Sequence, residues 1–429
     1  MNTDQLEKQW IKGVKMKKTG LTIMMLSMCI LMFAAELTIQ RERSVLREGP
    51  GSWHKVLAEL PIGSRVSTID NDTDDTDSDQ WIKVQTGTKT GYISESSTKK
   101  LPPKNNVFAA MAKQKTDVTS SRHGVSAGVK GFGERFSKTF RGDVSFVELA
   151  ATYQMDARSY KQFKKESYKG MNIKKIKNSV VFPKKLPSEY FSFSEEGFGL
   201  GVASAIASQG LYKDEALHQY INHLGNQIAE ASNASDIEFK FFVLNLEAAN
   251  AYACPGGYVF VTKGMIKQCD NEAELAVVLA HEIIHVVFSH GMKELEKRKN
   301  KVMADQMFDE MDEEMPTEDE EIALTEKEME DEAFSMYETI IKGRLDAYEQ
   351  EADEMGMLLT ARAGYNPVVL SSLLNRLNRS SMESNNQHYR KENIQQRMVW
   401  VDKFIAKNKF PAQLLYNKDR FTSMKARIR

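Results

Sequence analysis

The sequence predicts an α+β protein in which a small all-β barrel precedes a larger, mainly helical domain that carries a small antiparallel sheet. Residues 38–99 alternate short β-rich runs with Gly and Pro turns, which is typical of a small barrel. Further along, "IEFKFFVLN" and "GYVFVTKG" indicate strands, and the apolar run over residues 272–290 indicates a long buried helix. The stretch "DEALHQYINHLGNQIAEAS" predicts an amphipathic helix, because its large apolar residues recur at helical spacing: Leu217, Tyr220, Ile221, Leu224 and Ile228.

The bulk composition is that of a globular protein with more than one core. The chain has 429 residues, 41% of them apolar and 27% charged, which is enough for two or three domains. Its formal charge of −1 gives no overall field that would favour nucleic acid as a partner. Three cysteines cannot form a disulfide framework.

The N-terminal stretch has the layout of a secretion signal. In residues 15–36, basic residues precede about fifteen mostly apolar ones, and small residues follow. This run is short for a membrane span, which needs about 20 residues, so we expect cleavage near Ala35, with retention as an anchor as the alternative. The polar residues before Met16 fit no signal and favour a start at Met16. The sequence therefore predicts an extracytoplasmic protein of the periplasm or cell envelope, which contacts a membrane only if residues 1–36 stay uncleaved.

Three further regions follow residue 36. Residues 38–99 form the predicted barrel, residues 100–189 a linker and helical pro-region, and residues 190–429 the larger domain. Lys, Ser and Gly are frequent in the first part of the middle region, and its second part is basic and predicted to be helical. The larger domain carries an acidic insertion at 306–332, which fits either a solvated face or a lid over a cleft.

The barrel region resembles the bacterial SH3-like domain. The resemblance is carried by the arrangement of Arg47, Gly49-Pro50-Gly51, Gly63, Trp81 and Gly91-Tyr92. It implies a cell-wall peptide or a protein as the ligand of this barrel. A spacer barrel without a ligand is the alternative.

The stretch "LAHEIIHVVFSH" contains the main candidate for chemistry. His281 and His285 are four residues apart, so they lie on one face of a helix and can bind one metal ion. Glu282 lies beside them, where a carboxylate can take a proton from an activated water. This H-E-x-x-H pattern is typical of zinc peptidases. His290 lies nine residues after His281, about 180° round a regular helix, so we expect it at an exposed helix end.

A catalytic zinc needs a third protein ligand, and "AYEQEADEMG" offers it. Glu349 and Asp353 share one helical face, which predicts Glu349 as the ligand and Asp353 as a hydrogen-bond partner of a ligand imidazole. Glu351 points about 200° away from Glu349 and is the weaker choice. His218 and His223 lie off the apolar stripe of their helix and are expected at the surface.

The two blocks "NAYACPGGYVFVTKGMIKQCDNEAELAVVLAHEIIHVVFSHG" and "EQEADEMGMLLTARAGYNP" resemble the zinc metallopeptidases typified by HtpX, BepA and the CAAX prenyl protease. Over residues 190–380 the chain looks like the soluble, BepA-like branch. The likeness implies a zincin-type domain, one Zn²⁺ held by His281, His285 and Glu349, Glu282 as catalytic acid/base and Asp353 behind a ligand. It also implies that the substrate lies along an edge strand, with contacts at Asn250, Ala251, Tyr252, Gly256 and Gly257.

Members of this family often have a His and then an Arg near the end of the domain. Here "QHYRKENIQQR" contains His388 and Arg397, nine residues apart and without the usual Pro. We expect these two side chains to contact the substrate and steady its developing oxyanion. The tail after Pro411 is too short for the helical repeats that BepA carries.

The combined prediction is an exported zinc metalloendopeptidase that hydrolyses peptide bonds of envelope or misfolded proteins. One alternative is a catalytically idle envelope scaffold or binding protein, localised by its barrel. A third possibility is a peptidase that acts on cell-wall cross-links, and the resemblance of the barrel region to SH3-like domains is the only support for it.

Overall fold

The computed structural model describes residues 35–41, 44–69, 80–100, 142–183, 186, 193–235, 237–295, 297, 331, 334–341, 345–380 and 391–429. The predicted signal before Ala35, residues 306–330 of the acidic insertion, His123 and His388 lie outside the described residues. Among the described residues, no helix combines the length and the apolar character that crossing a membrane requires.

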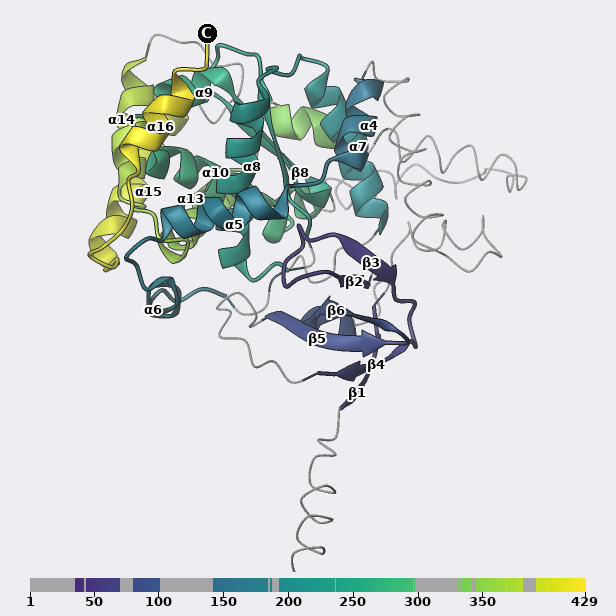
Figure 1. The fold of residues 1–429 in the computed structure, drawn as a ribbon. Coiled ribbons are helices and arrows are strands. Elements are labelled where there is room, and N and C mark those ends of the chain that lie inside the picture. Colours follow the sequence, from purple (N-terminus) through teal and green to yellow (C-terminus); the bar gives the residue numbers. More distant parts are fainter. Residues whose placement is uncertain are drawn as a thin grey trace, which may run out of the picture.

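The N-terminal unit is a six-stranded antiparallel sheet with the strand order β1-β4-β5-β6-β2-β3 (Figure 1). Its core is a small apolar cluster that includes Leu46, Val84 and Ile93, all fully buried. The strands are β1 (Glu36–Thr38), β2 (Val45–Arg47), β3 (Val56–Glu59), β4 (Arg65–Thr68), β5 (Trp81–Thr86) and β6 (Lys89–Ser94), followed by the short helix η2 (Glu95–Thr98). The all-β unit that the sequence predicts for residues 38–99 is therefore present, whereas its SH3-like ligand stays a prediction.

The second unit is mainly helical and contains a three-stranded sheet. Its elements are α4 (Val144–Thr152), α5 (Ala157–Ser167), α6 (Ile173–Ser179), α7 (Phe193–Ala207), α8 (Glu215–Ala229), η4 (Glu230–Ser232), β7 (Lys240–Leu244), β8 (Ala251–Cys254), η5 (Pro255–Gly257), β9 (Tyr258–Thr262), α9 (Lys263–Gln268), α10 (Glu272–Val287), α13 (Asp346–Arg362), α14 (Val369–Arg379), α15 (Lys391–Lys407) and α16 (Lys418–Lys425). The predicted α+β class is confirmed. In one detail the sheet differs from the expectation, because β7 and β9 pair in parallel and only β8 is antiparallel.

The helices of residues 142–183 belong to the core of this second unit. Phe146 on α4 packs edge-on against Phe242 of β7, with ring centroids 4.8 Å apart. Phe163 on α5 is buried in the same cluster as α8 and α10. The predicted helix is confirmed in this region, but residue 190 does not separate two cores.

Helix α8 covers one side of the sheet and pairs with the outer edge of β7. The Asn222 side chain both donates to the Phe241 carbonyl at 2.7 Å and accepts from the Phe241 amide at 3.0 Å. The expectation of surface histidines on this helix is wrong. His218 is half-buried and stacks on Phe242, and His223 is 5% exposed, where burial lowers its pKa to about 4.

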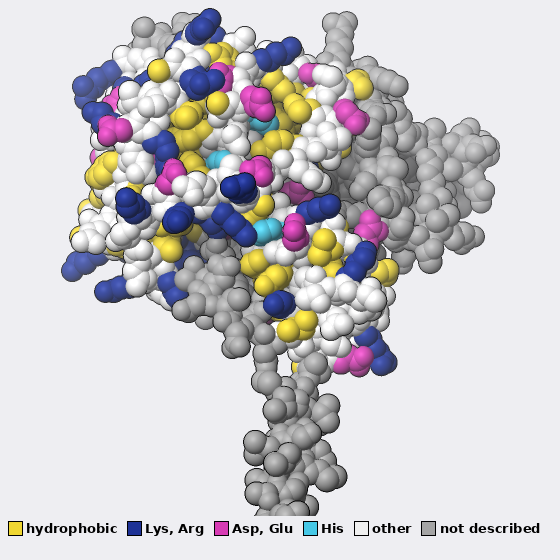
Figure 2. Space-filling model, in the orientation of Figure 1, with side chains coloured by type: hydrophobic (Ala, Val, Ile, Leu, Met, Phe, Trp, Pro, Cys, Tyr) yellow, Lys and Arg dark blue, Asp and Glu magenta, His cyan; other side chains and the backbone are white. Residues whose placement is uncertain are grey.

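The two units touch through polar side chains around η4. Trp53 donates its indole N–H to Glu230 at 2.6 Å, and its ring meets that of Tyr160 edge-on at 4.8 Å. Gln80 donates to Asn233 at 2.9 Å. On the face shown in Figure 2 the charges are mixed in sign, and Lys and Arg gather toward the side where α5 and α6 lie.

Candidate metal centre

Helix α10 holds the two motif histidines in the interior of the second unit. The helix begins after Asn271, whose side chain accepts a hydrogen bond from the Glu274 amide at 3.1 Å and so satisfies one of the first N–H groups. Every residue of α10 is buried, with β8 and β9 on one side and α13 on the other. His281 and His285 are 6% and 3% exposed and lie one turn apart on the face toward α13.

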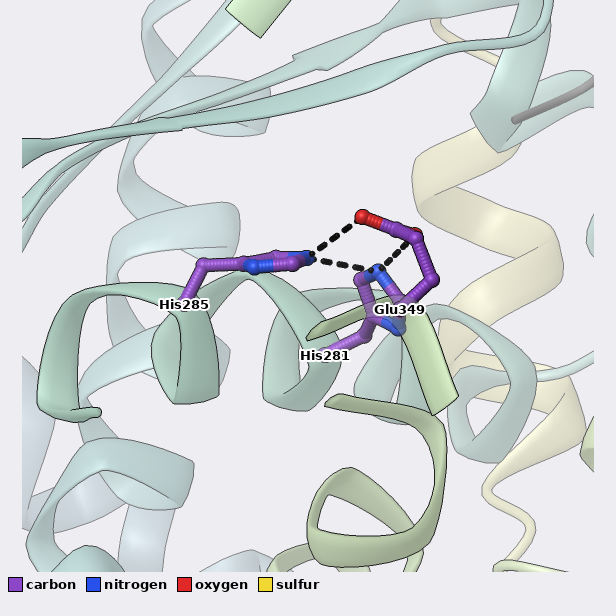
Figure 3. A group of neighbouring side chains, drawn as sticks. All are labelled: His281, His285 and Glu349. Atoms are coloured by element: carbon purple, nitrogen blue, oxygen red, sulfur yellow. Dashed lines mark hydrogen bonds and ion pairs between the residues drawn. The ribbon is translucent and has the colours of Figure 1, made fainter. Parts of the chain in front are cut away.

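Helix α13 approaches α10 closely because it has a glycine at the crossing. A Cβ atom at Gly356 would lie 3.1 Å from the backbone nitrogen of His281, closer than a side chain normally packs. Two turns earlier on α13, Glu349 is 2% exposed and points at the two histidines (Figure 3).

The three side chains present their donor atoms to one point. His281 Nε2 and His285 Nε2 are 3.1 Å apart, and each lies 3.2 Å from an oxygen of Glu349. Tetrahedral zinc with ligand bonds of about 2.0 Å would place its ligand atoms about 3.3 Å apart. Two imidazoles and one carboxylate at these separations therefore fit a zinc ion.

Asp353 contacts the His281 ring at Nδ1, the nitrogen that is not turned toward Glu349. Its Oδ1 lies 3.0 Å from His281 Nδ1, so the carboxylate can hold that imidazole with Nε2 toward Glu349. Arg397 donates to both oxygens of Asp353, at 2.9 and 2.7 Å, and Trp400 donates to Oδ2 at 2.9 Å. Burial alone would raise the pKa of Asp353, but the charge of Arg397 and the hydrogen bonds hold it well below the usual value.

Arg397 is 3% exposed and donates two hydrogen bonds to Asp353, one from Nε and one from Nη2. The structure therefore gives it a place behind His281, and contact with substrate stays a prediction. Trp400 completes this arrangement from the next turn of α15. The sequence carries no signal for Trp400, because the residue lies in an ordinary amphipathic helix.

The expected exposure of His290 is wrong. Its side chain is fully buried, its Nδ1 lies 2.9 Å from Nδ1 of His285, and its Nε2 lies 3.0 Å from Glu351. The reason is a break in the helix: Ser289 has a left-handed φ of 53°, so the backbone turns back and the regular spacing does not apply. Glu351 thus does contribute to the surroundings of the site, through His290.

Proton competition should govern metal binding at this site. Burial alone would lower the pKa of His281, but Asp353 and Glu349 outweigh it and raise the pKa to about 9. A cation must displace this proton, so we expect the apparent zinc affinity to rise about tenfold per pH unit up to about pH 9 and then level off. Competition titrations against a chelator across this range would measure it. An affinity that is flat between about pH 7 and pH 9 would contradict the prediction.

Two of the predicted substrate contacts, Tyr252 on β8 and Asn250 just before this strand, are joined by a hydrogen bond, and Tyr252 lies within the electrostatic reach of Glu282. Asn250 donates to the Tyr252 hydroxyl at 2.9 Å, and both side chains are buried. Burial raises the pKa of Tyr252 to about 12, and the charge of Glu282 adds to the shift. The hydrogen bond and the charge effect therefore link Asn250, Tyr252 and Glu282. Among the described strands, β8 is one of the two outer strands of its sheet, and β7 is the other.

The remaining predicted substrate contacts are Ala251, Gly256 and Gly257, and the backbone itself requires glycine at the last two. Gly256 and Gly257 have positive φ angles of 87° and 91°, and a Cβ at Gly257 would lie 2.8 Å from the Ile237 side chain. Ala251 is 4% exposed at the start of β8. Substrate contact at these three residues stays a prediction.

Residues 215–392 match the family model described as Peptidase family M48. The chain is 41% identical over 93 residues to the beta-barrel assembly-enhancing protease of Yersinia pestis, a stretch that is 22% of this chain and 19% of that protein. It is 38% identical over 92 residues to the protein of the same name in Escherichia coli (strain K12), covering 21% and 19%. It is 36% identical over 76 residues to the mitochondrial metalloendopeptidase OMA1 of Schizosaccharomyces pombe, covering 18% and 23%.

The matched stretch spans about a fifth of the length of these relatives. The predicted resemblance to BepA-like metallopeptidases is confirmed, and residues 215–392, which match the family model, contain both α10 and α13.

Proposed function

We propose that this chain is an exported, zinc-dependent metalloendopeptidase. The observation that carries the proposal is the convergence of His281, His285 and Glu349 at separations of 3.1–3.2 Å. These are close to the separation of about 3.3 Å expected around tetrahedral zinc, and Glu282 lies on the same helix as the two histidines. The family match over residues 215–392 and the similarity to a beta-barrel assembly-enhancing protease and to a mitochondrial metalloendopeptidase support it.

Each residue then has a defined task. His281, His285 and Glu349 hold the zinc, which when bound polarises the scissile carbonyl and lowers the pKa of a water molecule. Glu282 accepts the proton of the attacking water and returns it to the leaving amine. Its burial, at 4% exposure, keeps competing bulk water away from this carboxylate.

The proposed substrates are envelope or misfolded proteins, bound in an extended conformation along β8. Main-chain hydrogen bonds to a strand do not depend on the side chains of the bound peptide. They therefore suit an enzyme that cleaves unfolded proteins of many sequences. The position of β8 beside α10 supports this arrangement. The signal-like residues 15–36 support the extracytoplasmic location.

The alternative is an envelope scaffold whose peptidase site is idle. Purified full-length protein separates the two, because we expect about one zinc per chain and cleavage of casein that stops when a chelator removes the metal. Zinc without cleavage would favour the scaffold. Neither zinc nor cleavage would reject the proposal altogether.

A further inference from the structure

His290 and Glu351 form a buried polar chain that leads from the protein surface to His285. His290 is fully buried, and its ring stacks on Tyr348 with centroids 4.7 Å apart and an angle of 17° between the planes. Glu351 extends from α13 with its side chain 41% exposed. The chain therefore runs from solvent-exposed Glu351 through His290 to His285, 3.0 and 2.9 Å at its two steps.

The backbone at the end of α10 is what brings His290 into this place. Helix α10 ends at Val287, and Ser289 takes the left-handed φ of 53°, which non-glycine residues adopt uncommonly. The next helical turn starts at His290. A strained backbone at such a position is held by the contacts it makes possible, and here those contacts are with His285, Glu351 and Tyr348.

The directions of the hydrogen bonds allow one arrangement of protons along this chain when a cation is bound. His285 must turn an Nε2 lone pair toward the cation, so its proton lies on Nδ1. That N–H then donates to Nδ1 of His290, which must be the acceptor. The remaining proton of His290 lies on Nε2 and donates to Glu351, whose ionised carboxylate can only accept.

We infer that His290 is a positioning residue which, with Glu351, fixes His285 in the tautomer that binds the metal. If His290 carried its proton on Nδ1 instead, it would force the proton of His285 onto Nε2, where the cation must bind. Asp353 does the same for His281 in one step. The inference rests on the metal site of the proposed function.

Two substitutions at His290 separate this role from packing. His290→Phe keeps an aromatic ring against Tyr348 but removes both hydrogen bonds, and we expect it to weaken zinc binding about 10- to 100-fold. His290→Gln restores an acceptor for His285 and a donor for Glu351, and we expect affinity within about threefold of the wild type. The measurement is a zinc titration of the full-length chain against a competing chelator at fixed pH.

Glu351→Ala tests the outer end of the chain, and Glu354→Ala is its matched control on the same helix. Glu354 is paired with a different residue, because its carboxylate accepts from Gln350 at 2.8 Å. We expect Glu351→Ala to weaken zinc binding about three- to tenfold and Glu354→Ala to leave it unchanged. Equal affinities for these two variants, wild-type affinity in His290→Phe, or a Gln variant as weak as the Phe variant would each overturn the inference. Because zinc affinity is measured without substrate, missing casein cleavage by the wild type would contradict the proposed function alone.

Discussion

Replacing Glu282 by glutamine is expected to reduce casein cleavage about 10²- to 10⁴-fold while zinc binding is retained. The substitution keeps the size of a side chain that is 4% exposed, so the packing of α10 should persist. An amide cannot take up a proton from water near neutral pH, and general-base catalysis contributes rate factors of this size. The measurements are initial cleavage rates and metal content of the two purified proteins.

The control for this variant is Glu215→Gln, which makes the same chemical change at an exposed position in the first turn of α8. We expect wild-type cleavage from it. If Glu282→Gln cleaved casein as fast as this control while carrying zinc, the acid/base role of Glu282 would have to be abandoned.

The part of the site that follows from helical periodicity could be predicted from the sequence. His281 and His285 are four residues apart on a helix that is apolar enough to be buried, so their convergence needs no long-range information. Glu349 lies 64 residues after His285, yet its spacing to Asp353 identified the face of α13 that turns inward. The grouping of these three donors is observed, and their role as zinc ligands remains the proposal.

The part that depends on a break in periodicity could not be predicted. Regular helical spacing past Val287 predicts His290 at the surface, whereas the left-handed Ser289 interrupts the helix before His290. Residue 289 is not a glycine, so its left-handed conformation cannot be predicted from the residue type. The sequence offers Glu351 only as a weaker candidate for a metal ligand, and its contact with His290 follows from the interrupted helix.

A second buried polar cluster fixes the N-terminal end of the motif helix. Glu272, the first residue of α10, is fully buried and accepts from the hydroxyls of Tyr220 and Tyr365 at 2.9 and 2.7 Å. Arg420 on α16 pairs with it, through Nε at 2.7 Å and through Nη2. The last helix of the chain thereby holds the helix that carries His281 and His285, and the charge of Glu272 is compensated inside the protein.

Arg420→Met is expected to lower the free energy of unfolding by about 3 kcal/mol, because it leaves the Glu272 carboxylate buried without its cation. Methionine keeps part of the side-chain volume but loses the cation–π contact of the Arg420 guanidinium with the Phe163 ring, 4.1 Å from the ring centroid. Urea unfolding measures the change. The double variant Glu272→Gln/Arg420→Met should be more stable than Arg420→Met alone, since a neutral amide can accept from one tyrosine hydroxyl and donate to the other.

The matched control is Arg427→Met, a few residues further on. Arg427 pairs with Asp214 at 2.8 Å, but its side chain is 44% exposed, so this ion pair should contribute much less to stability than the buried pair of Arg420 and Glu272. Equal losses from the two arginine variants would mean that the Glu272 pair contributes no more than a surface contact. A double variant less stable than Arg420→Met would show that the cost does not come from an uncompensated charge. The α16 helix would then hold α10 through packing alone.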